Sequence, residues 1–319
     1  MRIGLTIHRT FPASEVSRFA RLAEDGGLDD LWLIEDCFFT AGPTLAASAL
    51  TATEKLRVGI GILPAVVRHP AVTAMELATL AALGPGRFVG GIGHGVQDWM
   101  GQMGLRPDSP LTALEETMHV VRRLLAGERV TFDGETVTLD GVRLEAPPGQ
   151  PVPLLAGVRG PKSMALAGRV ADGVILAEPA SPSYVEWARR EASAGDDFEI
   201  VAFASWIVMD DGAIARSIMA GMINEQLEHP HAGWGTLPFY EDLVDRRNDG
   251  GAEAIASMPL DWWHVLGPIG TRADAHAHLD RLEAVGVDTV AMFPAPEVDL
   301  ALGDLDAIIE IGRQRSRTR

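Results

Sequence analysis

The sequence predicts an α/β fold, a (β/α)8 TIM barrel with insertions. Short β-rich runs alternate with helical segments eight times along the 319 residues, a pattern typical of a parallel sheet whose strands are joined by helices. Two ordinary domains would have the same length, but barrels routinely exceed the usual domain size. No change of composition marks a domain boundary, and 47% of the residues are hydrophobic. We therefore expect one barrel domain over residues 1–319.

Each strand is expected where apolar and β-branched residues form a short run, and each helix where apolar residues recur on one face. The expected strands cover residues 2–8, 30–36, 56–64, 88–93, 152–157, 173–178, 199–209 and 288–294. The expected helices cover residues 14–25, 43–53, 70–83, 109–125, 160–168, 183–194 and 302–313. The fourth helix is the best marked, because Ser109 can cap it, Pro110 suits its first position and Gly127 closes it.

Two segments break the strand–helix rhythm and are expected to be insertions. Residues 129–149 alternate apolar and polar side chains around two Asp-Gly pairs, which predicts an antiparallel hairpin. Residues 211–285 are mostly helical in pattern, but a polar stretch with His229 and His231, at residues 228–243, fits no barrel element. This second insertion precedes the last strand.

Composition excludes several classes of partner and chemistry. A net charge of −17 disfavours nucleic acid and anionic membranes, because the long-range field repels both. The first ten residues resemble a strand and lack the features of a signal peptide, so we expect a cytoplasmic protein. The single Cys37 allows no internal disulfide and is interpreted as a packing residue. No metal site is expected, since zinc and P-loop motifs are absent and His276 and His278 face apart on a helix.

A barrel of this kind carries its functional groups where the strands end, in the loops that follow. That rule selects a polar rim before any other argument is made. Its members are His8, Arg9, Glu35, Asp36, residues 61–64, residues 94–98, residues 157–160, Lys162 and Glu178.

The stretch AGVRGPKS at residues 156–163 predicts an anion site. Gly157 and Gly160 free the backbone, a proline follows at the first helical position, and the N–H groups of a helix start point outward. Arg159 and Lys162 add positive charge to a strongly acidic chain. A plain strand-to-helix turn is the alternative interpretation.

The stretch GGIGHG at residues 90–95 is not a dinucleotide fingerprint, because Val96 stands where the third glycine is needed. His94 and Gly95 follow a predicted strand and could hold a polar ligand chain. A histidine that only bonds within its loop is equally compatible with the spacing.

Glu35 and Asp36 are adjacent at a strand end, so their side chains point to opposite sides. One carboxylate can therefore face the barrel mouth while the other packs or pairs. Burial among the flanking apolar residues would raise its pKa and suit it to proton transfer. Neighbouring carboxylates on a solvated surface are the simpler alternative.

Four stretches resemble the bacterial luciferase-like flavin and deazaflavin oxidoreductases, the luciferase-like monooxygenase superfamily, and above all members that use coenzyme F420. They are GLDDLWLIED (27–36), RVGIGILPAVVRHPAVTAMELATLAALGPGRFVGGIGHG (57–95), LTALEETMHVVRRLLAGERVTFDG (111–134) and AGVRGPKSMALAGRVADGVIL (156–176). The resemblance covers most of residues 1–180. It implies a luciferase-like (β/α)8 barrel, often dimeric, that holds F420 or FMN at its mouth.

The resemblance also implies which residues bind the cofactor. A bulge with a non-prolyl cis peptide behind the ring system falls on Gly61–Ile62, and the phosphate falls on the loop after the fourth strand and the helix start after the fifth. The implied cofactor-binding residues are Gly61, Ile62, Leu63, His94, Gly95, Gly157, Arg159, Gly160, Lys162 and Ser163.

Two positions depart from what the resemblance leads one to expect. Relatives often carry an acid followed by histidine after the second strand, where this chain has Glu35 and Asp36. Sugar-phosphate dehydrogenases of the family place a glutamate at the position of Val96, which argues against that substrate.

The resulting hypothesis is an F420-dependent oxidoreductase that transfers a hydride between the deazaflavin and a small organic substrate. Asp36 is predicted to transfer a proton or polarise the substrate, Glu35 to orient it, and His8 or His94 to act in its place. We further expect a homodimer, and a flavin or F420 reductase as electron supplier.

A two-component FMN monooxygenase is the nearest alternative, and a non-catalytic cofactor-binding barrel is the third. An aldolase is disfavoured because Lys55 and Lys162 do not stand at strand ends.

Overall fold

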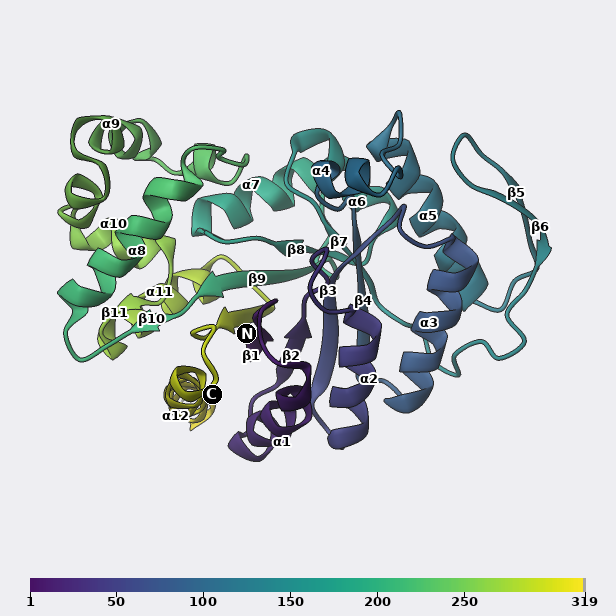
Figure 1. Cartoon of the computed structure of the whole chain (residues 1–319), viewed down its shortest axis with the longest axis horizontal. Coiled ribbons are helices and arrows are strands. Elements are labelled where there is room, and N and C mark those ends of the chain that lie inside the picture. The colour runs from purple at the N-terminus through teal and green to yellow at the C-terminus, as the bar shows by residue number, and fades with distance from the viewer. Residues whose placement is uncertain (318–319) are drawn as a thin grey trace.

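The computed structural model describes residues 1–317 and contains a closed barrel of parallel strands, as predicted (Figure 1). Neighbours around the barrel follow the order β1, β12, β9, β8, β7, β4, β3, β2. The strands are β1 (Arg2–Ile7), β2 (Asp30–Leu33), β3 (Arg57–Pro64), β4 (Phe88–Gly93), β7 (Leu154–Gly157), β8 (Gly173–Leu176), β9 (Glu199–Ser205) and β12 (Thr289–Phe293).

The helices that join these strands lie on the outside of the barrel, and α1, α2, α3, α5, α6 and α7 each pack against the next (Figure 1). They are α1 (Val16–Gly26), α2 (Gly42–Ala52), α3 (Pro70–Leu83), α5 (Pro110–Leu125), α6 (Pro161–Val170), α7 (Pro182–Ala192), α11 (Arg272–Ala284) and α12 (Val298–Arg317). Proline at the start of several of them supplies the fixed φ that a first helical turn needs. None of the helices in residues 1–317 is long and apolar enough to cross a bilayer.

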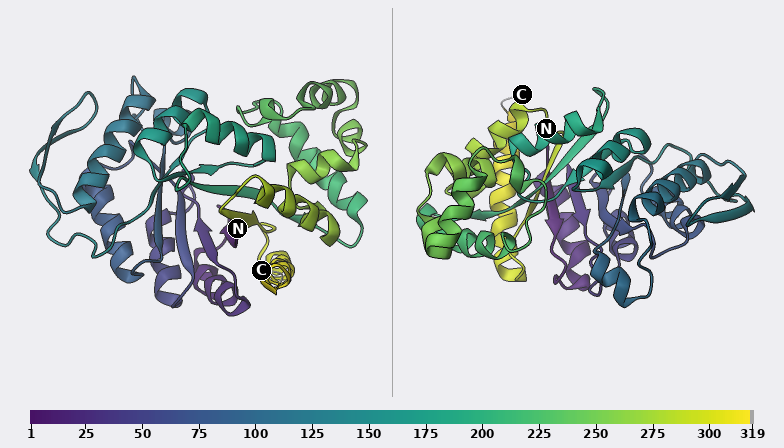
Figure 2. Two further views of the ribbon diagram at one scale, coloured as in Figure 1. Left: turned by 180° about the vertical axis from the view of Figure 1, so that it is seen from behind. Right: turned by 90° about the horizontal axis from the view of Figure 1, so that it is seen from above.

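Additional elements lie on opposite sides of the barrel (Figures 1 and 2). On one side, β5 (Val130–Asp133) and β6 (Thr138–Val142) form an antiparallel hairpin. On the other, a helical group has its own apolar core around Trp234 and Trp263. Its elements are β10 (Ile207–Val208), α8 (Gly212–Gln226), η2 (Trp234–Thr236), α9 (Tyr240–Ala256), α10 (Leu260–Leu266) and β11 (Ile269–Gly270).

Some predicted boundaries are wrong for reasons of tertiary pairing. The strand expected over residues 199–209 leaves the barrel after Ser205, because residues 207–208 pair instead with β11. The strands expected to reach residues 36 and 178 end at Leu33 and Leu176. Two short helices, η1 (Ala13–Glu15) and α4 (Gln97–Gln102), complete the described structure. Neither was expected as a helix of its own from the sequence, and no side chain caps α4.

Ion pairs and apolar side chains close the end of the barrel at which the strands begin. Asp30 is fully buried, and its Oδ2 accepts from Arg57 Nη1 at 3.0 Å and from Thr289 Oγ1 at 3.2 Å. Above this layer, Trp32 and Phe203 pack in the lumen with an apolar cluster from the neighbouring strands. A ligand can therefore enter only from the end at which the strands terminate.

Candidate active site

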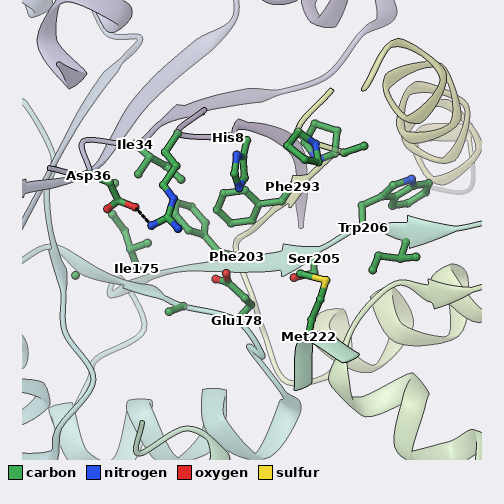
Figure 3. Close-up of a pocket in the computed structure, with 18 of the residues that line it drawn as sticks. His8, Ile34, Asp36, Ile175, Glu178, Phe203, Ser205, Trp206, Met222 and Phe293 are labelled. Atoms are coloured by element: carbon green, nitrogen blue, oxygen red, sulfur yellow. Dashed lines mark hydrogen bonds and ion pairs between the residues drawn. The ribbon is translucent and has the colours of Figure 1, made fainter. Parts of the chain in front are cut away.

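A cavity of about 1490 Å³ opens at the carboxyl ends of the strands. One wall is apolar and comes from Ile62, Ile175, Phe203 and Phe293, and Figure 3 shows the last three among the polar side chains His8, Asp36 and Glu178. A large concave site with an apolar lining and a few polar groups is the usual form of a small-molecule site.

The β3 bulge shapes this apolar wall of the cavity. The pairing of β3 with β4 shifts between Ile60 and Leu63, and the Gly61–Ile62 peptide is cis, as the resemblance implies. A Cβ on Gly61 would lie 2.7 Å from Phe203 Cζ, and one on Gly91 would lie 2.2 Å from the carbonyl oxygen of Ile60. These glycines are therefore required by close approach to the bulge, which turns Ile62 into the cavity.

One end of the cavity, which we call the anion end, consists of Gly95, Arg159, Gly160 and Ser163. Gly160 precedes α6, no side chain caps this helix, and a Cβ on Gly160 would meet nothing within 4 Å. The first N–H groups of a helix have no acceptor within it. The uncapped start of α6 therefore offers main-chain donors to an anion in the cavity.

His94 holds the anion end together. Its Nδ1 lies 3.0 Å from the carbonyl oxygen of Pro110, which can only accept, so Nδ1 carries the hydrogen. Its Nε2 then accepts from Ser163 Oγ at 2.8 Å. Burial lowers the pKa of His94 and favours this neutral form. Both ring nitrogens thus join the β4 loop to the starts of α5 and α6.

Two of the predicted cofactor-binding residues, Lys162 and Leu63, do not line the cavity, unlike the rest. Arg159 lines the cavity with an exposed side chain, whereas Lys162, although exposed, does not line it. Leu63 is 1% exposed and packs in the core behind the bulge. The α6 helix turns Lys162 outward, a direction that charge and spacing alone do not specify.

Glu35 is committed to a buried ion pair. Arg68 donates from Nη1 to Oε1 at 2.6 Å and from Nη2 to Oε2 at 2.8 Å, and the N–H of Gly42 at the start of α2 also donates to Oε2. The predicted orienting contact from Glu35 to Asp36 is not among the interactions described for residues 1–317. Glu35 instead fixes the α2 start and the arginine that precedes α3.

Asp36 faces the cavity and forms an ion pair with Arg9 in the loop that follows β1. Arg9 Nη1 donates to its Oδ2 at 3.1 Å (Figure 3), and the Arg9 guanidinium lies over the Phe39 ring at 5.0 Å. His8 lines the same wall, with Nδ1 2.8 Å from Thr10 Oγ1. Burial, together with Arg9, lowers the pKa of His8, so its imidazole is neutral near pH 7.

Glu178 follows β8 and points into the cavity in Figure 3. Burial raises the pKa of its carboxyl group, and the charge of Arg159 opposes that shift. Its main-chain oxygen lies 2.9 Å from His231 Nε2. The sequence placed Glu178 on the rim without assigning it a role, although a carboxylate between an apolar strand and Pro179 is the available signal.

The opposite end of the cavity, the apolar end, consists of Ile218 and Met222 on α8 and Leu300 on α12. These side chains are 49%, 41% and 62% exposed. Behind them, Trp206 Nε1 donates to Asp304 Oδ1 at 3.2 Å. Sequence analysis missed this end, because nothing local indicates which faces of α8 and α12 turn toward the barrel.

The chain is similar in sequence to several known proteins. A sequence model described as luciferase-like monooxygenase matches residues 1–289. A 5,10-methylenetetrahydromethanopterin reductase of Methanolobus tindarius is 30% identical over 91% of this chain and 93% of its own. An F420-dependent glucose-6-phosphate dehydrogenase of Nakamurella multipartita is 32% identical over 54% of this chain and 55% of its own.

A solved structure shares the fold. The coenzyme F420-dependent tetrahydromethanopterin reductase from Methanopyrus kandleri superposes with a TM-score of 0.75 at 22% identity, covering 98% of this chain and 97% of that one. The match extends across the predicted barrel and its insertions alike.

Proposed function

The chain belongs to the luciferase-like monooxygenase family, and on that premise we propose that it is a coenzyme F420-dependent oxidoreductase acting on a small organic substrate. The bound deazaflavin supplies hydride transfer to or from the substrate. The observation that carries the proposal is the coincidence, in one cavity, of the β3 bulge and the uncapped start of α6.

The residues present fit such a cofactor. Ile62 offers an apolar surface for a flat ring, and the main-chain N–H groups at the start of α6 suit a phosphate. The exposed Arg159 adds a cation in a chain with a net charge of −17. Both ring nitrogens of His94 form hydrogen bonds, one with Pro110 and one with Ser163. Its proposed role is therefore to position the phosphate site rather than to transfer protons.

Asp36 remains our proposal for the residue that polarises the substrate. Because Arg9 holds it in an ion pair, its carboxylate is a fixed negative charge at the cavity wall. His8, neutral and partly buried beside it, is the proposed second polar contact of the substrate.

The proposed substrate carries no phosphate, because among the described residues the apolar end offers no free cation to bind one. Arg272 lines the cavity but is paired with Glu310. Val96, also in the lining, is 46% exposed, so a hydrophobic side chain meets the ligand there. Both observations support a compound with an apolar part over a sugar phosphate.

Homodimer formation, a cytoplasmic location and a separate reductase as electron supplier complete the proposal. Val72 and Met75 on the outer face of α3 are 41% and 55% exposed, and apolar side chains of this kind favour association. Sedimentation of the purified chain tests the dimer.

Titration of the purified protein with F420 and, separately, with FMN tests the function, with cofactor fluorescence as the readout. We expect saturable quenching of F420 and none of FMN. Binding of FMN alone would favour a two-component monooxygenase, and binding of neither cofactor would contradict the proposal.

A further inference from the structure

One carboxyl group in the cavity differs from all the others. The carboxylates that line the cavity in the described part of the chain are Glu35, Asp36, Glu178, Asp210, Glu297 and Asp304. They can be sorted by two properties, namely whether a partner holds them and whether solvent reaches them. This sorting leaves a single group, Glu178, that is neither held by another residue nor fully exposed.

Three of these carboxylates are held by partners. Arg68 and the Gly42 N–H hold Glu35, and Arg9 holds Asp36. Asp304 accepts from Trp206 Nε1 and from the N–H of Ala295 at 2.8 Å. Each of these three carboxylates therefore already has a partner within the protein, and Asp304 is tied to the loop that leads into α12.

Two further carboxylates, Asp210 and Glu297, are exposed at the mouth of the cavity, where water solvates them. Glu178 is only partly exposed, and no other residue in 1–317 donates a hydrogen bond to its carboxylate or pairs with it within 4.0 Å. In Figure 3 it points toward Phe203, between Asp36 on one side and Ser205 on the other. It therefore faces the middle of the cavity, between the anion end and the apolar end.

We propose that Glu178 is the acid–base residue of the reaction, which gives a proton to the polar atom of the substrate or takes it back, and that His231 positions it. This inference rests on the proposed function. In reduction of a carbonyl group, the substrate carbon gains the hydride that the reduced deazaflavin supplies and its oxygen gains the proton of Glu178. The carboxylate then regains a proton from solvent, so atoms and electrons balance.

The backbone of Glu178 is fixed by the helical insertion. The Nε2 of His231 donates to the Glu178 carbonyl oxygen at 2.9 Å, and its Nδ1 accepts from the Gly233 N–H at 3.0 Å. Burial lowers the pKa of His231 to about 4, so it stays neutral and keeps this donor. The His231 ring also packs against Tyr184 of α7 at 5.7 Å between centroids.

The surroundings of Glu178 raise the pKa of its carboxyl group. Burial is the largest cause and the Asp36 carboxylate adds to it, whereas the main-chain N–H of Glu178 itself, Arg159 and Arg9 favour the ionised form. Tyr184 carries no charge near neutral pH, since burial raises its pKa to about 12. A carboxyl group with a raised pKa is suited to proton transfer near pH 7.

Labelling with dicyclohexylcarbodiimide tests this proposal without any substrate, because the reagent attacks carboxyl groups that carry a proton. We expect an adduct on the Glu178 peptide at pH 7 that declines as the pH rises, and its absence in Glu178→Gln. The label is expected to persist in Asp36→Asn. An unlabelled Glu178, or labelling that does not change with pH, would overturn the proposal.

Kinetics supply the second arm, with oxidation of reduced F420 by methyl ketones from acetone to 2-decanone as the assay. Glu178→Gln should lower kcat about 100-fold or more, with KM changed less than about threefold, while F420 binding is retained. A kcat within about twofold of the parent enzyme would overturn the proposal. If no ketone is reduced, the labelling decides alone.

The two failures are distinguishable. Loss of F420 binding in the unmodified protein contradicts the proposed function whatever the label shows. Unimpaired F420 binding with an unlabelled Glu178 contradicts only the acid–base role.

His231 has a separate test. His231→Ala should admit water beside Glu178 and lower the pH at which labelling declines, while His231→Gln, which can still donate to the same carbonyl, should restore it. A purely structural residue would lower the free energy of unfolding without moving that pH. An unmoved pH in His231→Ala would therefore contradict the positioning role.

Discussion

The two ends of the cavity are built from different parts of the chain. At the anion end the contacts come from backbone, because Gly95 and Gly160 bring main-chain atoms to the surface of the cavity. At the apolar end they come from side chains on α8 and α12, such as Met222 and Leu300. Residues that contact a ligand through closely approaching backbone can be replaced by few other residues. Side chains that line a wall can be replaced without disturbing the barrel. This difference supports our proposal that the cofactor, the constant ligand, binds at the first end and the variable substrate at the second.

The largest expected effect concerns pH and the helical insertion, whose α8 carries the apolar end. Burial lowers the pKa of His231 and His278 from 6.5 to about 4; His231 lies in the insertion, and His278 on α11 contacts it through the carbonyl oxygen of His264. The pKa of His94 at the anion end is lowered in the same direction. The unfolded chain then binds more protons, so stability is full above pH 6.5 and declines as the pH falls toward 4. His231 and His278 should each reduce the free energy of unfolding by about 2 kcal/mol at pH 5. Urea unfolding at pH 7.5, 6 and 5 measures the loss.

The matched control is His231→Gln with His278→Gln. This double variant should flatten the dependence on pH, even if it is less stable at every pH. An unchanged slope would show that the acid sensitivity lies elsewhere, and would break the distinction between the two sides.

The second effect concerns the rigidity of the backbone at Gly157, which lines the cavity beside the anion end. In Gly157→Val, the new Cβ would lie 2.3 Å from Ile62 Cγ2, and the bulge cannot move without disturbing the pairing of β3 with β4. Overpacking of this kind should lower the free energy of unfolding by about 2 kcal/mol and abolish F420 binding.

Gly160→Ala is the control at the same end, since its Cβ meets nothing within 4 Å. We expect its stability to stay within about 0.5 kcal/mol of the parent. Equal losses in both variants would contradict the steric argument, and urea unfolding with F420 titration provides both readouts.

The third effect tests which cation serves the phosphate. Arg159→Gln should raise the Kd for F420 about tenfold, which corresponds to about 1.4 kcal/mol, and reduce its dependence on salt. Lys162→Gln should change it less than about twofold, because that side chain does not line the cavity. A larger effect at Lys162 would favour the arrangement expected from the sequence over the one in the structure.

The smallest effect belongs to the apolar end. Leu300→Glu should weaken binding of the neutral dye Nile red about fivefold, about 1 kcal/mol, and leave F420 binding unchanged. Ile214→Glu is the matched control, since Ile214 is 50% exposed on α8 but does not line the cavity. Equal dye binding in the parent and both variants would remove the argument for an apolar substrate.

The sequence predicted most of the barrel and much of the anion end, because both depend on local rules. Strand–helix alternation marks the barrel, and glycine followed by proline at residues 160–161 marks an open helix start. The cis bulge at Gly61–Ile62 came from the resemblance alone, since spacing does not reveal a peptide geometry. The outward direction of Lys162 depends on how α6 is oriented, which its charge does not indicate.

The polar centre of the cavity could not be predicted in the same way, because distant partners decide it. Glu35 was expected to orient Asp36, but Arg68, 33 positions further along the chain, takes its carboxylate. Arg9, 27 positions earlier in the chain, forms an ion pair with Asp36. Only when these pairs are assigned does Glu178 stand out as the partly buried carboxyl group of the cavity that no other described residue holds, and no pattern in the chain records those pairs.

We propose that backbone at the start of α6 and a few cations bind the phosphate of a ring cofactor whose ring lies against the β3 bulge. A crystal structure of the protein with F420 would show whether both contacts are made. We predict phosphate density within hydrogen-bond distance of the main-chain nitrogens of Lys162 and Ser163, with the ring in contact with Ile62. Phosphate bound elsewhere, or a ring at the apolar end against Met222 and Leu300, would contradict the account.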